Sequence, residues 1–267
     1  MDEGVMKFPF QLKKFANYGS SHPAPARLFL QMADLLQITD VPEGDREQIR
    51  QHLFRASDEM VKAEEKKNAF IANCQRFHES VREGRGIRAQ QHALELDEPE
   101  GLADDYQLFL IRLVIGLRMA IKAAKIILDL TEKRKWEDFT KEVERRFGAE
   151  HPLTRVIRKH GAWTKDLFEV RGDVEHDPYI FQGFKVLIGE AGIPQLVDPK
   201  LPDGRPAPAA LAGYYDDGFV FAEELVVEAI KTRLPGFAVV REIPEEQRDP
   251  GKPIRYVLDL ATGTLPP

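Results

Sequence analysis

Cysteine is almost absent from this sequence: the 267 residues include a single one, Cys74. One thiol cannot form a disulfide within the chain, and it cannot supply the thiolates of a structural zinc site. Cys74 falls within a stripe of apolar residues at helical spacing, so we expect a buried packing residue and not a nucleophile. The seven histidines do not pair with carboxylates at the spacing of metal ligands. We therefore expect neither a metal nor another cofactor.

Long hydrophobic runs are missing as well. The most apolar stretch, residues 108–117, is interrupted by Arg112 and is shorter than the roughly 20 residues of a membrane-spanning helix. The first residues, MDEGVMKFPF, are acidic and do not resemble a secretory signal. These features predict a cytoplasmic protein that does not contact a membrane.

The sequence also lacks the basic excess that is typical of general nucleic-acid-binding proteins, because its net charge is −6. This value still permits a local basic surface. No GxxxxGK[ST] loop occurs, which argues against the P-loop class of nucleotide hydrolases. With 43% hydrophobic and 31% charged residues, the composition is typical of a soluble globular protein.

Helical periodicity, by contrast, covers most of the first two thirds of the chain. Apolar residues at helical spacing predict helices over residues 28–39, 43–81, 102–132, 136–147 and 152–176, and Pro178 ends the last of them. Long helices joined by short connectors favour antiparallel, up-and-down packing. The stretch 83–101 is expected to be a connector with at most a short helical turn.

Strand signals occur at both ends of the chain. Residues 5–12 alternate between apolar and polar side chains, and we expect them to pack against the region after Pro178. That region has four short apolar runs typical of strands, at 184–189, 193–198, 237–243 and 254–260, one helix around 222–230, and turns at 202–209 and 214–218. The predicted fold class is α+β and mainly α. It consists of an N-terminal strand and linker (1–23), an antiparallel helical bundle (24–178) and a small α+β module (179–267).

The stretch FEVRGDVEHDPY, residues 168–179, contains the candidate site. Arg171 and His176 lie five positions apart, late in the last long helix of the bundle. Other arginine–histidine pairs in the chain have a similar spacing, but none has this context. Five residues of a regular helix turn through about 500°, which leaves the two positions roughly 140° apart. They converge if the helix is distorted, which Gly172 favours, or if a symmetric dimer joins residues of two chains.

This motif, Arg171-x4-His176 in a helical bundle, resembles that of the HEPN (higher eukaryotes and prokaryotes nucleotide-binding) domains. Members of this family are mostly four-helix bundles. Many are metal-independent endoribonucleases that act as dimers, whereas others only bind nucleotides or protein partners. The resemblance covers at most residues 24–178, and Gly172 stands where the family usually has a polar residue.

The resemblance implies a role for each residue of the motif. His176 would deprotonate the ribose 2′-hydroxyl, because histidine titrates near neutral pH. Arg171 would bind the phosphate with its planar guanidinium, and Glu175 or Asp173 would orient the histidine. Cleavage would need no metal and would leave a 2′,3′-cyclic phosphate.

The same residues can also be explained by a purely structural role. Arg171 and Glu175 are i,i+4 neighbours that can form a surface ion pair, and a helix C-terminus favours His176 as a cation. The protein would then be a non-catalytic helical scaffold that binds a protein partner or a small ligand.

The predicted helix 102–132 supplies two further candidate surfaces. Arg118, Lys122 and Lys125 share one of its faces and form a candidate RNA-binding strip, although such a stripe is more often a solvated surface. The same helix carries more apolar surface than one groove of a small bundle needs, and an excess of this kind predicts a homodimer. RNA and a second copy of the chain are thus the predicted partners.

Overall fold

A computed structural model describes residues 19–90, 93–130, 136–176, 182–188 and 194–261. The short π-helix η1 (Pro25–Leu30) leads into α1 (Gln31–Leu36), and the remaining helices are α2 (Glu43–Arg82), α3 (Leu102–Ile127), α4 (Trp136–Phe147), α5 (Pro152–His176) and α6 (Ala207–Lys231), with a 3-10 turn at Glu245–Gln247. The described strands form antiparallel pairs: β1 (Ile87–Gln90) with β2 (Ala93–Leu96), β3 (Lys185–Ile188) with β4 (Pro194–Val197), and β5 (Ala238–Glu242) with β6 (Tyr256–Leu260). The predicted class, α+β and mainly α, is confirmed.

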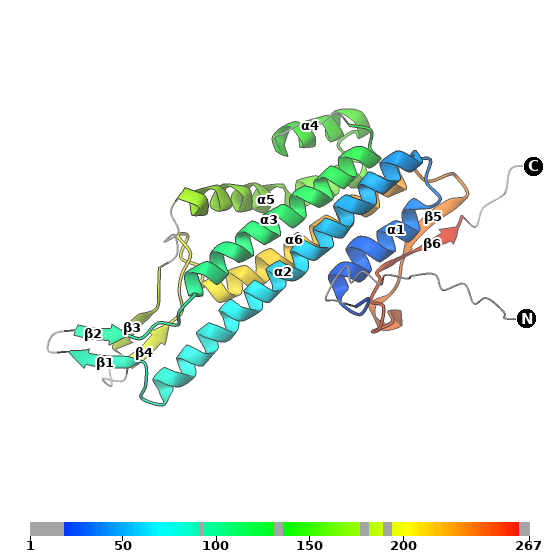
Figure 1. The fold of residues 1–267 in the computed structure, drawn as a ribbon. Helices are drawn as coiled ribbons and strands as arrows, with labels where there is room; N and C mark the ends of the chain where they lie inside the picture. The colour runs from blue at the N-terminus through cyan, green and yellow to red at the C-terminus, as the bar shows by residue number, and fades with distance from the viewer. Residues whose placement is uncertain (1–18, 91–92, 131–135, 177–181, 189–193, 262–267) are drawn as a thin grey trace, which may run out of the picture.

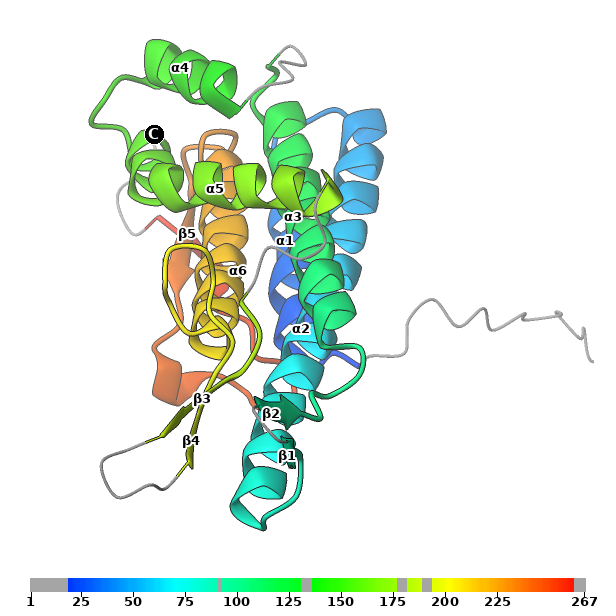
Figure 2. The same cartoon turned by 90° about the vertical axis from the view of Figure 1, so that its left-hand side faces the viewer.

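Three long helices form the body of the molecule. α2 runs in the opposite direction to α3 and α6, and the three lie side by side (Figure 1). α5 crosses them, and α4 lies at one end of the bundle (Figure 2). The β5–β6 hairpin packs near α1, whereas β1–β2 and β3–β4 lie together at the opposite end. The C-terminal part of the chain therefore contributes α6 to the bundle itself.

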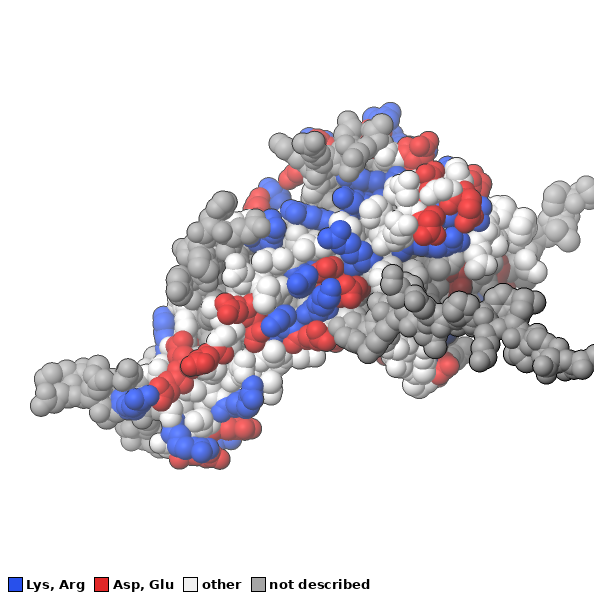
Figure 3. All heavy atoms as spheres, in the orientation of Figure 1, with Lys and Arg blue, Asp and Glu red and all other residues white. Residues whose placement is uncertain are grey.

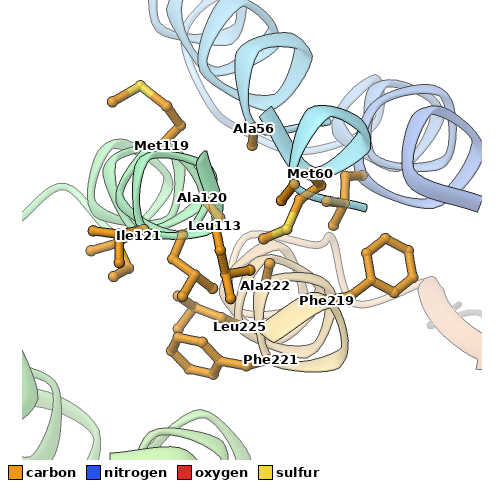
Figure 4. Close-up of a cluster of buried hydrophobic side chains, with 14 of the residues drawn as sticks. Ala56, Met60, Leu113, Met119, Ala120, Ile121, Phe219, Phe221, Ala222 and Leu225 are labelled. Carbon is orange, nitrogen blue, oxygen red and sulfur yellow. The ribbon is translucent and has the colours of Figure 1, made fainter. Parts of the chain in front are cut away.

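The core lies where α2, α3 and α6 meet, and two glycines allow these helices to approach closely. A Cβ on Gly116 would lie 3.3 Å from the carbonyl oxygen of Ala56 and from Met60, both on α2. A Cβ on Gly218 of α6 would lie 3.0 Å from Leu113. The surrounding apolar side chains in Figure 4 are Met119, Ala120, Ile121, Phe219, Phe221, Ala222 and Leu225.

The prediction of a turn at 214–218 is wrong, because α6 continues through this stretch. Tyr214, Tyr215 and Gly218 are buried, whereas Asp216 and Asp217 are exposed on the outer side of the helix. The pattern YYDDG is therefore one turn of an amphipathic helix. Its glycine serves close packing and does not break the helix.

The prediction for the connector 83–101 is also wrong, because this stretch contains the hairpin β1–β2. Its register pairs Arg88 with Glu95 and Gln90 with Ala93. Gly84 and Gly86 both have φ of +79°, a left-handed conformation that glycine adopts without strain, and they turn the chain out of α2. The missed signal is the alternation of apolar and polar residues in IRAQ, which is only four residues long.

Two further expectations concern the predicted N-terminal strand and the predicted dimer. The predicted strand 5–12 lies outside the described residues. The apolar surface of α3 is covered within the chain, since its large apolar side chains pack against α2, α5 and α6. None of the exposed large hydrophobic side chains among the described residues belongs to α3. The excess apolar surface from which a dimer was predicted is thus covered in cis, and the dimer stays a prediction.

A fully buried carboxylate joins both ends of the described chain to α6. Glu223 of α6 accepts hydrogen bonds from both Arg27, at 2.8 Å from Nε, and Gln31, at 3.1 Å. The guanidinium of Arg255 lies 3.5 Å from the same carboxylate. Gln31 Oε1 in turn accepts hydrogen bonds from the backbone N–H groups of Arg255 and Tyr256, each at 2.6 Å. This network fixes η1–α1 and β6 on α6.

Replacing Glu223 with alanine is expected to lower the free energy of unfolding by about 3–5 kcal/mol, because it leaves Arg27, whose side chain is only 16% exposed, without its carboxylate partner. Urea denaturation measures this change. The matched control is Glu150→Ala, which removes the exposed partner of Arg155 and should change stability by less than about 0.5 kcal/mol. Equal effects of the two substitutions would contradict the role given to Glu223.

Candidate functional site

The helix that carries the arginine–histidine motif is regular. α5 is a continuous α-helix from Pro152 to His176, and Gly172 lies within it. Positions 171 and 176 are therefore about 140° apart around the helix axis. Of the two routes to convergence, the distortion at Gly172 is not observed. The side chains of Asp173, Glu175 and His176 lie outside the described part of the structure, so their roles stay predictions.

Arg171 lies close to the crossing of α5 and α3. It is half-buried, and its Nε is shielded from solvent. Phe168 precedes it by three residues, so the two side chains are neighbours on the surface of α5. The guanidinium of Arg118, on α3, lies 5.5 Å from the ring centroid of Phe168. Arg118 of the predicted strip therefore packs on a residue of α5 that lies three positions before Arg171 of the predicted motif.

The cationic strip, defined as Arg118, Lys122 and Lys125, follows α3 from this crossing toward α4. Lys122 is exposed, and Nζ of Lys125 lies 5.5 Å from the ring centroid of Phe139 on α4. Lys and Arg side chains gather over this part of the molecule in Figure 3, between areas of acidic side chains. A cation–π contact therefore holds the side chain at each end of the strip, which orients its charge and restricts its conformations.

Packed aromatic rings support the α5 side of the strip. Trp136 contacts Phe168 and Phe221 edge-on, with centroid distances of 6.4 and 5.6 Å. Phe221 also contacts His160 and Trp163, at 5.2 and 6.0 Å. Rings from α4, α5 and α6 thus form one cluster. We infer that this cluster holds Phe168 in place.

A second polar cluster, which no sequence pattern indicated, surrounds Glu64. This carboxylate receives hydrogen bonds from Tyr215, at 3.0 Å, and from Nε2 of His22, at 3.1 Å. Nδ1 of His22 accepts the backbone N–H of Ala24 at 3.2 Å. Both ring nitrogens are engaged, and burial raises the pKa of the Tyr215 hydroxyl far above its usual range. This cluster anchors the start of η1.

A cavity of about 490 Å³ lies between α5, α6 and the β5–β6 hairpin. Its walls carry both charges, but the charges are already paired: Lys159 with Glu224 at 3.2 Å, and Arg255 with Glu242 at 2.8 Å. Nδ1 of the buried His160 accepts a hydrogen bond from Trp163, and its Nε2 lies 3.5 Å from Glu224. Because these charges pair with one another, the cavity has little positive charge left with which to bind an anionic ligand.

Three further observations on the described residues concern Cys74, metal-binding groups and membrane-spanning helices. Cys74 is 2% exposed, and burial raises the pKa of its thiol to about 12, as expected for a packing residue. In the part of the chain that the structure describes, no group of three or more His, Cys, Asp or Glu side chains is arranged to hold a metal ion. None of the described helices combines the length and the apolarity of a bilayer-spanning segment.

Comparison with family models, with curated proteins and with solved structures found no match for this chain. The resemblance to HEPN domains therefore rests on the arginine–histidine motif and its helical setting alone. The contact of Arg118 with Phe168, beside Arg171, is a feature that the sequence pattern did not indicate.

The carboxyl group of Glu224 predicts a pH dependence of stability. Its contacts with His160, and then with Lys159, lower its pKa from 4.5 to about 2. Because the pKa of this carboxyl is lower in the folded than in the unfolded protein, its ionised form stabilises the fold at pH values above about 4.5. This contribution to stability is lost as the pH falls from about 4.5 to about 2. The loss should reach up to about 3 kcal/mol. Urea denaturation across this range should show a shallower decline for Glu224→Gln, and identical declines would contradict the assignment.

Proposed function

We propose that the protein binds single-stranded RNA along the cationic strip and, as a dimer, cleaves it at Arg171 and His176. The observation that supports the proposal is the position of Arg171. It lies beside Phe168, on which Arg118 rests, so the predicted phosphate ligand adjoins the first residue of the strip. A strand bound along α3 would reach Arg171 without leaving the protein surface.

The chemistry proposed for this site follows from the residue types. The guanidinium of Arg171 binds the scissile phosphate and stabilises the charge that develops on its oxygens. The imidazole of His176 removes the proton from the ribose 2′-hydroxyl, and the 2′-oxygen then attacks the phosphorus and expels the 5′-oxygen. The 5′-oxygen takes a proton from water, and the imidazolium returns its proton to the solvent. The products are a 2′,3′-cyclic phosphate and a free 5′-hydroxyl.

The regular course of α5 supports an active site that two chains share. Because positions 171 and 176 face different sides of one helix, the proposed active site takes its arginine from one chain and its histidine from the other. A two-fold axis near the end of α5 then produces two equivalent sites. A monomer would still bind RNA on the strip but would not cleave it.

The strip predicts a specific salt dependence of RNA binding. Its three cations span about 10 Å of helix, so they contact only a few phosphates of one strand. Each cation that neutralises a phosphate contributes about −0.7 to the slope of log K against log salt concentration. Lys122→Gln should therefore make the slope shallower by about 0.7. Fluorescence anisotropy with a labelled oligonucleotide measures it.

Lys141→Gln is the matched control for Lys122→Gln, because Lys141 is an exposed lysine of α4 outside the strip. It should leave the slope unchanged. The same slope for wild type, Lys122→Gln and Lys141→Gln would show that the strip does not bind RNA.

Mixing two inactive variants tests the composite active site. Arg171→Ala and His176→Ala should each abolish cleavage of single-stranded RNA, since loss of a general base alone costs a factor of about 10² to 10⁴. A dimer of one chain of each kind contains one intact site. An equal mixture that exchanges freely should thus recover about a quarter of the wild-type activity.

The mixing experiment distinguishes several outcomes. A mixture that stays inactive while each variant still dimerises would contradict a site shared between chains. Activity of His176→Ala at the wild-type rate would remove the histidine from the mechanism. If the wild-type protein cleaves no RNA, the arginine–histidine pair has a structural role and the protein is a non-catalytic scaffold.

A further inference from the structure

The β5–β6 hairpin exposes most of the large apolar side chains found at the surface of the described residues. They are Phe237, Val239, Leu258 and Leu260, which are 56, 42, 40 and 70% exposed, and the one other is Leu187 of β3. We call the four side chains of the hairpin the hairpin patch. Apolar side chains gathered in this way usually mark a contact surface.

The first described residues of the chain lie against the same hairpin. The hydroxyl of Ser20 donates to the carbonyl oxygen of Gly251, at 3.4 Å, in the connection between β5 and β6. Lys252 of this connection lies 3.6 Å from Asp34 of α1. α1 also contacts β6 directly. The chain that precedes Gly19 therefore starts beside β6.

We propose that residues 5–12 cover two members of the hairpin patch of the same chain, Leu258 and Leu260. These residues lie outside the described part of the structure, and the argument uses their sequence and the place where the described chain begins. Met6, Phe8, Phe10 and Leu12 alternate with polar residues and proline. Such a segment needs an apolar surface to cover one of its sides.

The register of the hairpin indicates which side chains receive the segment. Leu258 is paired with Val240, and Leu260 with Ala238, so both leucines share one face of the hairpin. Val239 lies on the other face. Because the chain arrives from α1 on the β6 side, the two leucines of β6 are the nearer contact. Leu260 is also the most exposed member of the patch.

The reach and the charge of the segment agree with this position. Residues 13–19 span at most about 25 Å when extended, and β6 is about 17 Å long. The chain between residue 12 and Ser20 is thus long enough for residues 8–12 to reach both leucines. Lys13 and Lys14 would pass the β5–β6 connection, which carries exposed Glu245, Glu246 and Asp249.

This cover has a consequence for association. A chain with its own segment on the hairpin does not present Leu258 and Leu260 to a second molecule. A chain that lacks residues 1–18 exposes the patch, and exposed strands with apolar side chains pair readily with other chains. The inference is independent of RNA binding, because the hairpin and the cationic strip are separate surfaces.

A disulfide between introduced cysteines tests the proposal. Phe10→Cys combined with Leu260→Cys places thiols on the two surfaces that are proposed to meet. The matched control, Gln11→Cys with Leu260→Cys, differs by one position and lies on the opposite side of the alternation. Cys74 does not compete, because it is 2% exposed and its thiol pKa is raised to about 12.

Under mild oxidation of the full chain, the Phe10→Cys pair should form an intramolecular disulfide at least about tenfold faster than the control pair. Equal rates would indicate random collisions of a tethered segment and would overturn the proposal. Disulfides formed mainly between chains would assign the patch to a second copy. Absence of any disulfide, with both thiols titrated as free, would also overturn it.

Discussion

The burial of one carboxylate, that of Glu223, constrains the arrangement of this molecule more than any other polar contact. An ionised group without solvent is tolerated only where oppositely charged and hydrogen-bonding groups surround it, and removal of one partner costs several kcal/mol. Here the partners come from η1, α1 and β6, which are far apart in the sequence; Arg27 and Glu223 are 196 residues apart. The two ends of the described chain therefore have to meet on α6. This requirement places the β5–β6 hairpin beside α1 and keeps α6 within the bundle.

Local sequence signals predicted the elements that depend on local physics. The bounds of α4 and α5 agree with the prediction, because Trp136 opens an amphipathic run and Pro152 suits the first turn of a helix. The β1–β2 hairpin and the helical course of 214–218 were missed for different reasons. The first has strands of four residues, which give little periodicity. The second contains a glycine whose role, close contact with Leu113, depends on a helix more than a hundred residues away.

The candidate site shows the same division. The residue types and their helical spacing indicated Arg171 and the cationic strip from the sequence. The contact that relates them, Arg118 on Phe168, depends on how α5 crosses α3, and no spacing rule gives that crossing. The Glu223 and Glu64 networks were not foreseen either, because each joins side chains from separate parts of the chain. Pairs of this kind become apparent only after the helices have been packed.

The regular helix of α5 also bears on the two ways in which Arg171 and His176 were expected to meet. Bringing position 176 to the side of position 171 within one chain means unwinding the last turn of α5, which loses helical hydrogen bonds. Phe168 and Arg171 lie in the adjoining turns and would have to keep their positions during this unwinding. Phe168 is packed against Trp136 and Arg118, so its position is restricted. A second chain requires no such change, because in a two-fold dimer the same surface of each chain faces the axis, and position 176 of one chain can lie beside position 171 of the other while both helices stay regular. The packing under Phe168 thus argues that, if the two residues act together, they do so across two chains.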